Sequence, residues 1–259
     1  MSDIIRQETF SSADIKLTSP AEIKTIVKNF KNGKAPGWDD IPNIVLKNLN
    51  NKALVQLTHI FNCSLKLSYF PNAWKTAIIL PIYKGGGKDK KEPTSYRPIS
   101  LLCTISKIFE KIILTRLNRE GKLETEVLND DQFGFRESRS TVKQLARVVF
   151  DITNNFNLKK STAALLLDVE KAFDTVWHDG LIYQLKEYNI PIYIIRIISS
   201  FLSSRKFKVK VGNDLSTSKT QAAGVPQGSI LGPKLYIIYN NNIPANKETK
   251  KALFADDTQ

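Results

Sequence analysis

Cysteine and histidine are scarce in this sequence, which has two of each among its 259 residues. Cys63 and Cys103 belong to no CxxC motif, and His59 and His178 have no HxxxH spacing. Structural zinc sites need closely spaced thiol and imidazole ligands, and disulfide-stabilised proteins need several cysteine pairs. The sequence therefore predicts neither a zinc domain nor a disulfide framework.

Long hydrophobic runs are also missing. The first residues lack the apolar stretch of a secretory signal, and the most apolar segment, 190–202, is too short to span a bilayer and contains Arg196. No repeat, low-complexity tract or interdomain linker is present. These absences favour an intracellular protein without a membrane partner, built as one large domain or two closely packed subdomains.

Acidic residues are outnumbered, with 25 Asp and Glu against 38 Lys and Arg, which gives a net charge of +13. A surplus of this size favours a polyanionic partner, because basic groups near phosphates release condensed counterions. A merely soluble basic protein and an anionic membrane surface are the alternatives, and nucleic acid is the preferred interpretation.

Local patterns alternate between helical and strand periodicity. Ser19 begins a capping box, Ser140 can cap a later helix, and Pro191 divides one helical stretch in two. Predicted helices follow Ser19, cover about 53–69, surround 105–113, follow Ser140, cover 181–202 and cover 229–240; predicted strands are 76–83, 162–169, 206–211 and a segment that begins at 251. This mixture predicts an α+β fold.

Three carboxylates follow apolar segments that we expect to be strands. Asp168 follows the run 163–167, which is typical of a central strand buried on both faces, and Asp256 and Asp257 follow 252–255. Neighbouring strand residues point to opposite faces, so the aspartate pair can serve one site only at a sharp turn, such as a hairpin tip beside Asp168. Carboxylates gathered in this way favour Mg²⁺. Two ions about 3.5–4 Å apart can activate an attacking 3′-hydroxyl and stabilise a leaving pyrophosphate. A turn or helix cap is the more common role for an isolated Asp-Asp pair.

Six blocks occur in a fixed order along the chain. They are KAPGWD at 34–39, SYRPISLL at 95–102, QFGFR at 132–136 with Arg-Ser-Thr at 139–141, LDVEKAFD at 167–174, GVPQGSILGP at 224–233 and FADD at 254–257. In this order they resemble the reverse transcriptases of non-LTR, LINE-type retrotransposons, and KAPGWD resembles the lead-in of jockey-like elements. The resemblance covers nearly the whole chain.

The resemblance implies a catalytic and metal-binding role for Asp168, Asp256 and Asp257, with the Val169 carbonyl as a backbone ligand. Two Mg²⁺ ions, with Mn²⁺ as a substitute, would be the cofactors. Asp174 lies outside this trio and is expected to hold structure.

The resemblance also implies a nucleotide-binding set, Lys84, Arg97, Phe173, Gln227 and Gly228. Phe173 matches the family's steric gate, an aromatic ring that leaves no room for a 2′-hydroxyl. Each residue has an ordinary alternative: a core phenylalanine, a strand-to-helix connection at 227–228, and a solvated hairpin at 84–93. Five further basic residues have two alternatives each, contact with phosphate or template and plain solvent exposure. They are Arg136, Arg139, Lys206, Lys208 and Lys210.

The implied architecture is that of right-hand polymerase fingers and palm, with an RRM- or ferredoxin-like palm sheet backed by helices and no thumb. We expect lead-in helices in 1–50, fingers in 51–160 and a palm in 161–259, truncated after the Asp-Asp pair, so that the chain alone is poorly active.

The implied reaction is RNA-directed DNA polymerisation from template RNA, primer or target DNA, and dNTPs. The family's elements usually encode an endonuclease in the same parent polyprotein, and a ribonucleoprotein in nucleus and cytoplasm is the implied location. A catalytically dead nucleic-acid-binding remnant and a protein like a group II intron maturase are the alternatives.

Overall fold

The computed structural model describes residues 15–244, 249–255 and 257–258, the last two by backbone alone. The α-helices are α2 (Pro20–Lys28), α3 (Asn43–Lys47), α4 (Asn51–Lys66), α5 (Thr104–Glu120), α6 (Thr141–Asn157), α7 (His178–Glu187), α8 (Ile192–Leu202) and α9 (Gly232–Tyr239). The 3₁₀ turns η2 (Asn72–Trp74) and η3 (Pro93–Ser95) and the π turn η4 (Leu123–Val127) complete the helical elements. The strands are β1 (Thr76–Tyr83), β2 (Tyr96–Leu101), β3 (Arg205–Val211), β4 (Asp214–Leu215), β5 (Lys219–Gln221), β6 (Leu253–Phe254) and β7 (Asp257–Thr258).

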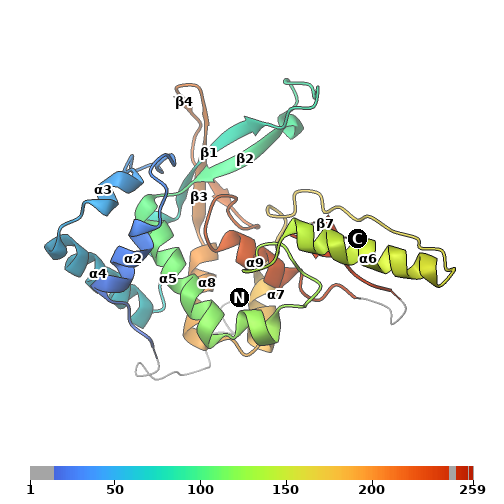
Figure 1. The fold of residues 1–259 in the computed structure, drawn as a ribbon. Helices are drawn as coiled ribbons and strands as arrows, with labels where there is room; N and C mark the ends of the chain where they lie inside the picture. Colours follow the sequence, from blue (N-terminus) through green and yellow to red (C-terminus); the bar gives the residue numbers. More distant parts are fainter. Residues whose placement is uncertain (1–14, 245–248, 256, 259) are drawn as a thin grey trace.

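A mixed five-stranded sheet lies above a group of helices that includes α5, α8 and α9 (Figure 1). Its path is β2-β1-β3-β4, with β5 also paired to β3. β1 is antiparallel to β2 and parallel to β3, and Thr76 lies opposite Lys206 in that parallel register. The helices and mixed sheet confirm the predicted α+β class.

The capping signals in the sequence form as predicted at two helix starts. Ser19 Oγ accepts the Glu22 backbone N–H at 3.2 Å, and Ser140 Oγ accepts that of Lys143 at 3.3 Å. The Glu22 carboxylate, however, binds Arg116 on α5 at 2.7 Å through both oxygens. The expected capping box is therefore half formed, and its glutamate joins α2 to α5.

One continuous core runs from α2 through α5, α8 and α9. Rings at its end nearest the sheet pack edge to face or stacked, with centroids 5.0–5.8 Å apart; they belong to Phe61, Phe70, Trp74, Phe109 and Phe201. Because this core contains residues from 1–50, 51–160 and 161–259, the three predicted segments pack together. The segment boundaries themselves stay predictions.

Helix α6 stands at the edge of the molecule, with the β6–β7 hairpin beside it (Figure 1). The sequence predicted this helix after Ser140. Several of its apolar side chains are nevertheless open to solvent, because Val142, Leu145, Val149 and Phe150 are 51–75% exposed. The helical period of the apolar residues thus predicted the helix correctly, but it does not show which other element covers those residues.

The predicted central strand at 162–169 is wrong. Residues 161–170 are exposed and irregular apart from a single bridge at Leu167, and Leu165, Leu166 and Leu167 are 50–72% exposed. An apolar run becomes a strand only where neighbours satisfy its backbone and cover its side chains. Here β6, the last predicted strand, contains only two residues and pairs with β7 and, through a parallel bridge at Leu253, with Gln132.

Among the described residues, no helix combines the length and apolar character needed to cross a bilayer.

Candidate nucleotide and metal site

A cavity of about 840 Å³ lies between one face of the sheet, the loop after β1 and the segment that precedes α7. Six of the residues predicted for the site line it together: Lys84, Arg97, Asp168, Val169, Phe173 and Gln227. Gly228, the seventh, is adjacent to Gln227 in the chain. Residues 84 and 227 are 143 positions apart in the sequence (227 minus 84), so this grouping is a property of the fold.

Three cations from one hairpin line the cavity, Lys84, Lys88 and Arg97. Arg97 on β2 lies opposite Ile82 on β1, and the Lys84 ammonium donates to the Thr94 carbonyl at 2.8 Å. Tyr96 closes the loop by donating its hydroxyl to the Lys90 carbonyl at 2.9 Å. All three side chains are solvent-accessible, so the hairpin offers positive charge to an anion that enters the cavity.

Phe173 is held between aromatic neighbours. Its ring stacks on Tyr236 with centroids 5.0 Å apart and meets Phe135 edge to face at 6.0 Å. Its carbonyl accepts the Val225 N–H at 2.7 Å, which ties its backbone to the loop that carries Gln227. Packing therefore fixes this ring at the cavity wall and against the core, and its role as a steric gate stays a prediction.

Hydrogen bonds to β2 and α5 hold the loop at 224–231 in place. The Gln227 carbonyl accepts the Ser100 N–H at 2.7 Å, and a side-chain hydrogen bond joins Gln227 to Asp174. Gly228 has φ +119°, and a Cβ there would lie 2.4 Å from the Ser100 oxygen. Glycine is therefore required at 228 both by its backbone conformation and by the close approach of β2.

Burial raises the pKa of Asp174, while Lys171 and the hydrogen bond from Gln227 oppose the shift. Asp174 thus lies at the cavity wall beside Gln227, and the structural role expected for it stays a prediction.

Glu110 on α5 is a buried residue that holds the loop at 230–231 beside this site, and the sequence assigns it no role. One of its oxygens accepts the Ile230 and Leu231 N–H groups at 2.6 and 3.2 Å, and the other accepts the Ser106 hydroxyl at 3.3 Å. The guanidinium of Arg205 lies near enough to influence it electrostatically. A glutamate within the apolar stripe of a predicted helix was the available signal, since buried carboxylates need partners.

Strands β6 and β7 form a hairpin, as predicted for this segment. β6 and β7 pair in antiparallel register, Phe254 with Asp257, and Ala255 at the tip has φ +60°. Gln132 clamps that tip, because its side chain accepts the Ala255 N–H at 3.0 Å and donates to the Ala255 carbonyl at 3.3 Å. Gly134 is equally close: a Cβ there would lie 2.0 Å from the Ala255 nitrogen.

The predicted convergence of three aspartates is only partly visible. Asp168 lies in the exposed segment along the cavity, whereas Asp256 and the side chain of Asp257 fall outside the described residues. Among the residues that are described, no group of three or more His, Cys, Asp or Glu side chains could hold a metal ion. The three-carboxylate site therefore stays a prediction.

Arg136 and Arg139 have partners within the chain. Arg136 is buried and bonds to Glu124 at 2.8 Å and to the Asn129 carbonyl at 2.8 Å, and Glu124 also binds the buried Lys234. Arg139 pairs with Asp130 at 2.6 Å. Arg136 is therefore a structural ion-pair residue, and the exposed helix entry proposed for it is wrong.

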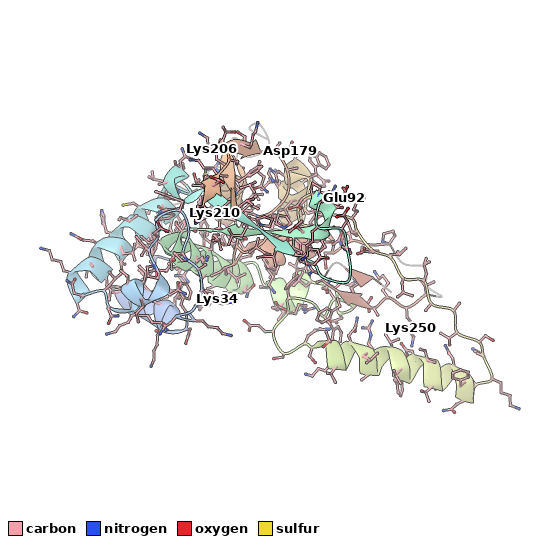
Figure 2. The ribbon with its side chains drawn as sticks, turned by 90° about the horizontal axis from the view of Figure 1, so that it is seen from above. Lys34, Glu92, Asp179, Lys206, Lys210 and Lys250 are labelled. Atoms are coloured by element: carbon pink, nitrogen blue, oxygen red, sulfur yellow. The ribbon has the colours of Figure 1, made fainter. Side chains whose placement is uncertain are left out.

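The strand predicted at 206–211 is confirmed, and its side chains alternate between the two faces of the sheet. Phe207 and Val209 face the cavity described above, whereas Lys208 and Lys210 line a second cavity on the opposite face. Figure 2 labels Lys206 and Lys210 along this strand.

Comparison with known proteins identifies a family and several relatives. The sequence profile described as "Reverse transcriptase (RNA-dependent DNA polymerase)" matches residues 88–259. The chain is 40% identical over 97% of its length to a protein of Drosophila melanogaster named "Probable RNA-directed DNA polymerase from transposon BS". It is 41% identical over 92% of its length to the X-element counterpart and 40% identical over 92% to "RNA-directed DNA polymerase from mobile element jockey", both from the same species. The chain spans 26–29% of the length of these relatives.

Proposed function

The chain belongs to the reverse transcriptase family, and from this premise we propose that it is the nucleotide-binding and catalytic part of a jockey-like retrotransposon RNA-directed DNA polymerase. The single observation that carries the proposal is the cavity of about 840 Å³ that gathers Lys84, Arg97, Asp168, Phe173 and Gln227. A dNTP site needs cations for the triphosphate and a shaped wall for the sugar. It also needs carboxylate oxygens for the metal ions that bind the phosphates. The cavity supplies all three.

Within this cavity Lys84 and Arg97 would bind the triphosphate of an incoming dNTP. Arg97 suits the role because a guanidinium can hold two phosphate oxygens at once. Phe173 would lie under the sugar, where its stacked position against Tyr236 prevents the ring from yielding to a 2′-hydroxyl. Gln227 and Gly228 would contact the nucleotide and its template base, held in place by Ser100 and Glu110.

Asp168, Asp256 and Asp257 would hold two Mg²⁺ ions, with Mn²⁺ as a substitute and the Val169 carbonyl as a further ligand. The solvent-accessible Asp168 lines the cavity and fits this role, because a hard cation prefers carboxylate oxygen. The ions would activate the primer 3′-hydroxyl and stabilise the leaving pyrophosphate. The chain's own contribution is to aim Asp168 at the cavity and to fix the hairpin tip through Gln132.

The wider assignments follow the same proposal. Residues 51–160 would form fingers and 161–259 a palm, with 1–50 as the lead-in. Template RNA and primer or target DNA would be the partners, an endonuclease would share the polyprotein, and the protein would act in a nuclear and cytoplasmic ribonucleoprotein. A remnant that only binds nucleic acid is the second candidate, because the chain has a net charge of +13.

Primer extension on an RNA template with Mg²⁺ separates the two candidates. The 259-residue chain and a version lengthened toward the relatives' size should be compared. We expect weak extension from the first and strong extension from the second, and none from either after Asp168→Asn. Binding without extension in both would favour the remnant.

Sugar selectivity tests the cavity itself. Phe173→Val in the lengthened protein should admit ribonucleotides, because it removes the ring from the cavity wall. Phe156→Val is the matched control, since Phe156 lies on α6 and is 71% exposed. Equal discrimination against ribonucleotides in both variants would contradict the assignment of Phe173.

A further inference from the structure

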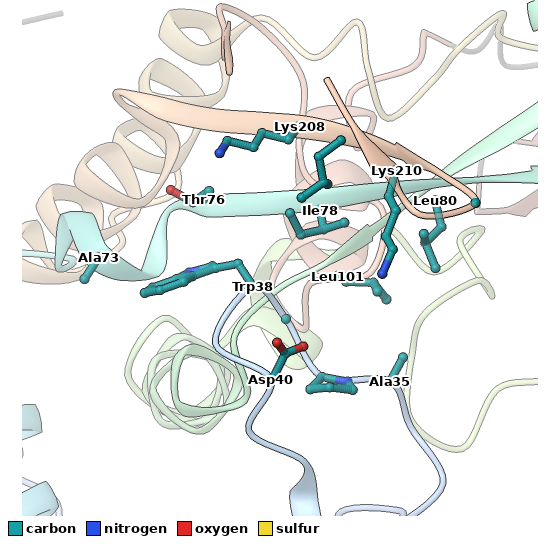
Figure 3. Close-up of a pocket in the computed structure, with 14 residues that line it drawn as sticks. Ala35, Trp38, Asp40, Ala73, Thr76, Ile78, Leu80, Leu101, Lys208 and Lys210 are labelled. Atoms are coloured by element: carbon teal, nitrogen blue, oxygen red, sulfur yellow. The ribbon is translucent and has the colours of Figure 1, made fainter. Parts of the chain in front are cut away.

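A second cavity, of about 850 Å³, lies on the opposite face of the sheet from the proposed dNTP site (Figure 3). The loop 35–40 forms one wall, and β1 and β3 form the other. In the sequence, KAPGWD is only a family signature, and Lys208 and Lys210 have no assigned role. In the structure these two features form one cavity.

The cavity combines an aromatic face, an apolar floor and cations. Trp38 is 48% exposed, and Ile78, Leu80 and Leu101 supply the floor. Figure 3 shows Lys208 on the Trp38 side of the cavity and the Lys210 ammonium on the other side, toward Asp40 and Ala35. Neither lysine has an ion-pair partner among the described residues.

The loop that carries Trp38 is fixed before any ligand arrives. A Cβ at Gly37 would lie 2.4 Å from the Cys103 nitrogen, so the loop presses on the chain between β2 and α5. The Thr104 hydroxyl donates to the Ile41 carbonyl at 2.8 Å, and the Asp40 N–H donates to the Gly37 carbonyl at 3.2 Å. A ligand that stacks on Trp38 therefore meets a preorganised surface, which lowers the entropic cost of binding.

We propose that this cavity binds one nucleotide unit of a single-stranded nucleic acid outside the polymerase site. The base stacks on Trp38 above the apolar floor, and Lys208 and Lys210 contact the phosphates on either side. Asp40 accepts a hydrogen bond from a base N–H. Aromatic stacking between flanking cations is how proteins hold single strands without reading their sequence. An acidic peptide would also pair with the lysines, but its side chains gain less than a base from stacking on the flat Trp38 ring.

The test is fluorescence anisotropy of the 259-residue chain with fluorescein-labelled oligo(A) RNA, and in parallel with labelled oligo(dA). Trp38→Ala should weaken binding about tenfold, because stacking of one base contributes on that scale. Trp177→Ala is the matched control: Trp177 is 63% exposed and lies outside the cavity. Trp38→Phe keeps an aromatic face and should retain most of the affinity, which protects the test if the alanine variant folds poorly.

Charge is tested separately with the double variant Lys208→Gln/Lys210→Gln. Loss of two phosphate contacts should reduce the slope of log affinity against log salt by about 1.4, because each contact with a single strand contributes about 0.7. Lys24→Gln/Lys52→Gln removes the same charge from α2 and α4 and should leave the slope nearly unchanged. Equal slopes in the two double variants would overturn the proposal.

Three further outcomes are decisive. Weaker RNA and DNA binding in the Trp38 variants supports a general single-strand site, and an effect on RNA alone identifies RNA as the ligand. Binding that depends on Arg97 but not on Trp38 refutes this second site and leaves the proposed dNTP site intact. Trp38-dependent capture of poly-glutamate in place of RNA would assign the cavity to a protein partner.

Discussion

Glu110 is the buried group whose removal should disturb the proposed dNTP site most without touching the ligand. Its carboxylate accepts two backbone N–H groups from the loop that carries Gln227, and it lies near the buried Arg205. Glu110→Ala leaves those two N–H groups without their acceptor and removes a negative charge near the guanidinium. Each buried donor left unsatisfied costs about 1–3 kcal/mol, so the expected total is about 2–6 kcal/mol.

The neutral variant Glu110→Gln separates hydrogen bonding from charge. Glutamine keeps the side-chain volume and one acceptor oxygen for the two N–H groups, so its expected cost is about 1–2 kcal/mol. Near neutral pH, urea unfolding should therefore rank the proteins as parent, then Glu110→Gln, then Glu110→Ala. Since a domain of this kind has about 5–15 kcal/mol of stability in total, the alanine variant should still be measurable.

A functional measurement must accompany the unfolding experiment, because a purely structural effect would lower stability alone. If Glu110 positions Gln227, Glu110→Gln should raise the KM for dNTP more than it lowers kcat. Glu92→Ala, in the exposed loop after β1, is the control for loss of one carboxylate (Figure 2). The reasoning is refuted if Glu110→Ala unfolds within about 0.5 kcal/mol of that control, the range of ordinary surface substitutions.

Three further changes test other parts of the structure. Burial, with Arg205 nearby, lowers the pKa of Lys75 from 10.5 to about 8, so the folded state binds that proton less tightly than the unfolded state. Stability should therefore rise between pH 8 and 10.5 by at most about 3 kcal/mol, and Lys75→Met should flatten this rise in pH-dependent urea unfolding. Gly134→Ala should displace the hairpin tip and lower primer extension at least about tenfold, whereas Gly33→Ala, with nothing near its new methyl group, should not. Arg136→Met should cost about 3–5 kcal/mol because Glu124 loses one of its two cationic partners and the Asn129 and Glu124 carbonyls lose a donor. Arg139→Met at an exposed pair should cost at most about 1 kcal/mol, and equal losses in thermal unfolding would show that the difference in burial is unimportant.

Short-range signals in the sequence predicted most of the elements. Ser19 and Ser140 cap helices, Pro191 separates α7 from α8, and the alternation at 206–211 forms β3. Each of these features depends on a few residues that are neighbours in the sequence, so a local pattern is enough to predict it. The grouping of Lys84, Arg97, Phe173 and Gln227 came from family resemblance, because no local pattern relates positions so far apart.

The predictions that failed concern residues whose structure depends on contacts with distant parts of the chain. The run 163–167 has the composition of a buried strand, but burial requires a partner on each side, and composition cannot supply one. Solvent exposure was one alternative for Arg136 because it lies just before the helix that follows Ser140, yet it reaches Glu124 twelve positions away. Glu110 escaped notice because its partners at 230 and 231 are 120 and 121 residues distant.

Strand β3 connects the two proposed sites, and its register decides which residues each site receives. Its odd-numbered side chains, Phe207 and Val209, face the dNTP cavity, and Lys208 and Lys210 face the outer one. A slip of one residue against β1 would exchange the two sets, placing ammonium groups where the apolar wall belongs. The buried Arg205 opposes such a slip, since it stacks on Phe201 at 4.7 Å and donates to the Phe201 carbonyl at 3.1 Å. A buried cation at the start of the strand therefore helps to set the chemistry on both faces of the sheet, although it lines neither cavity.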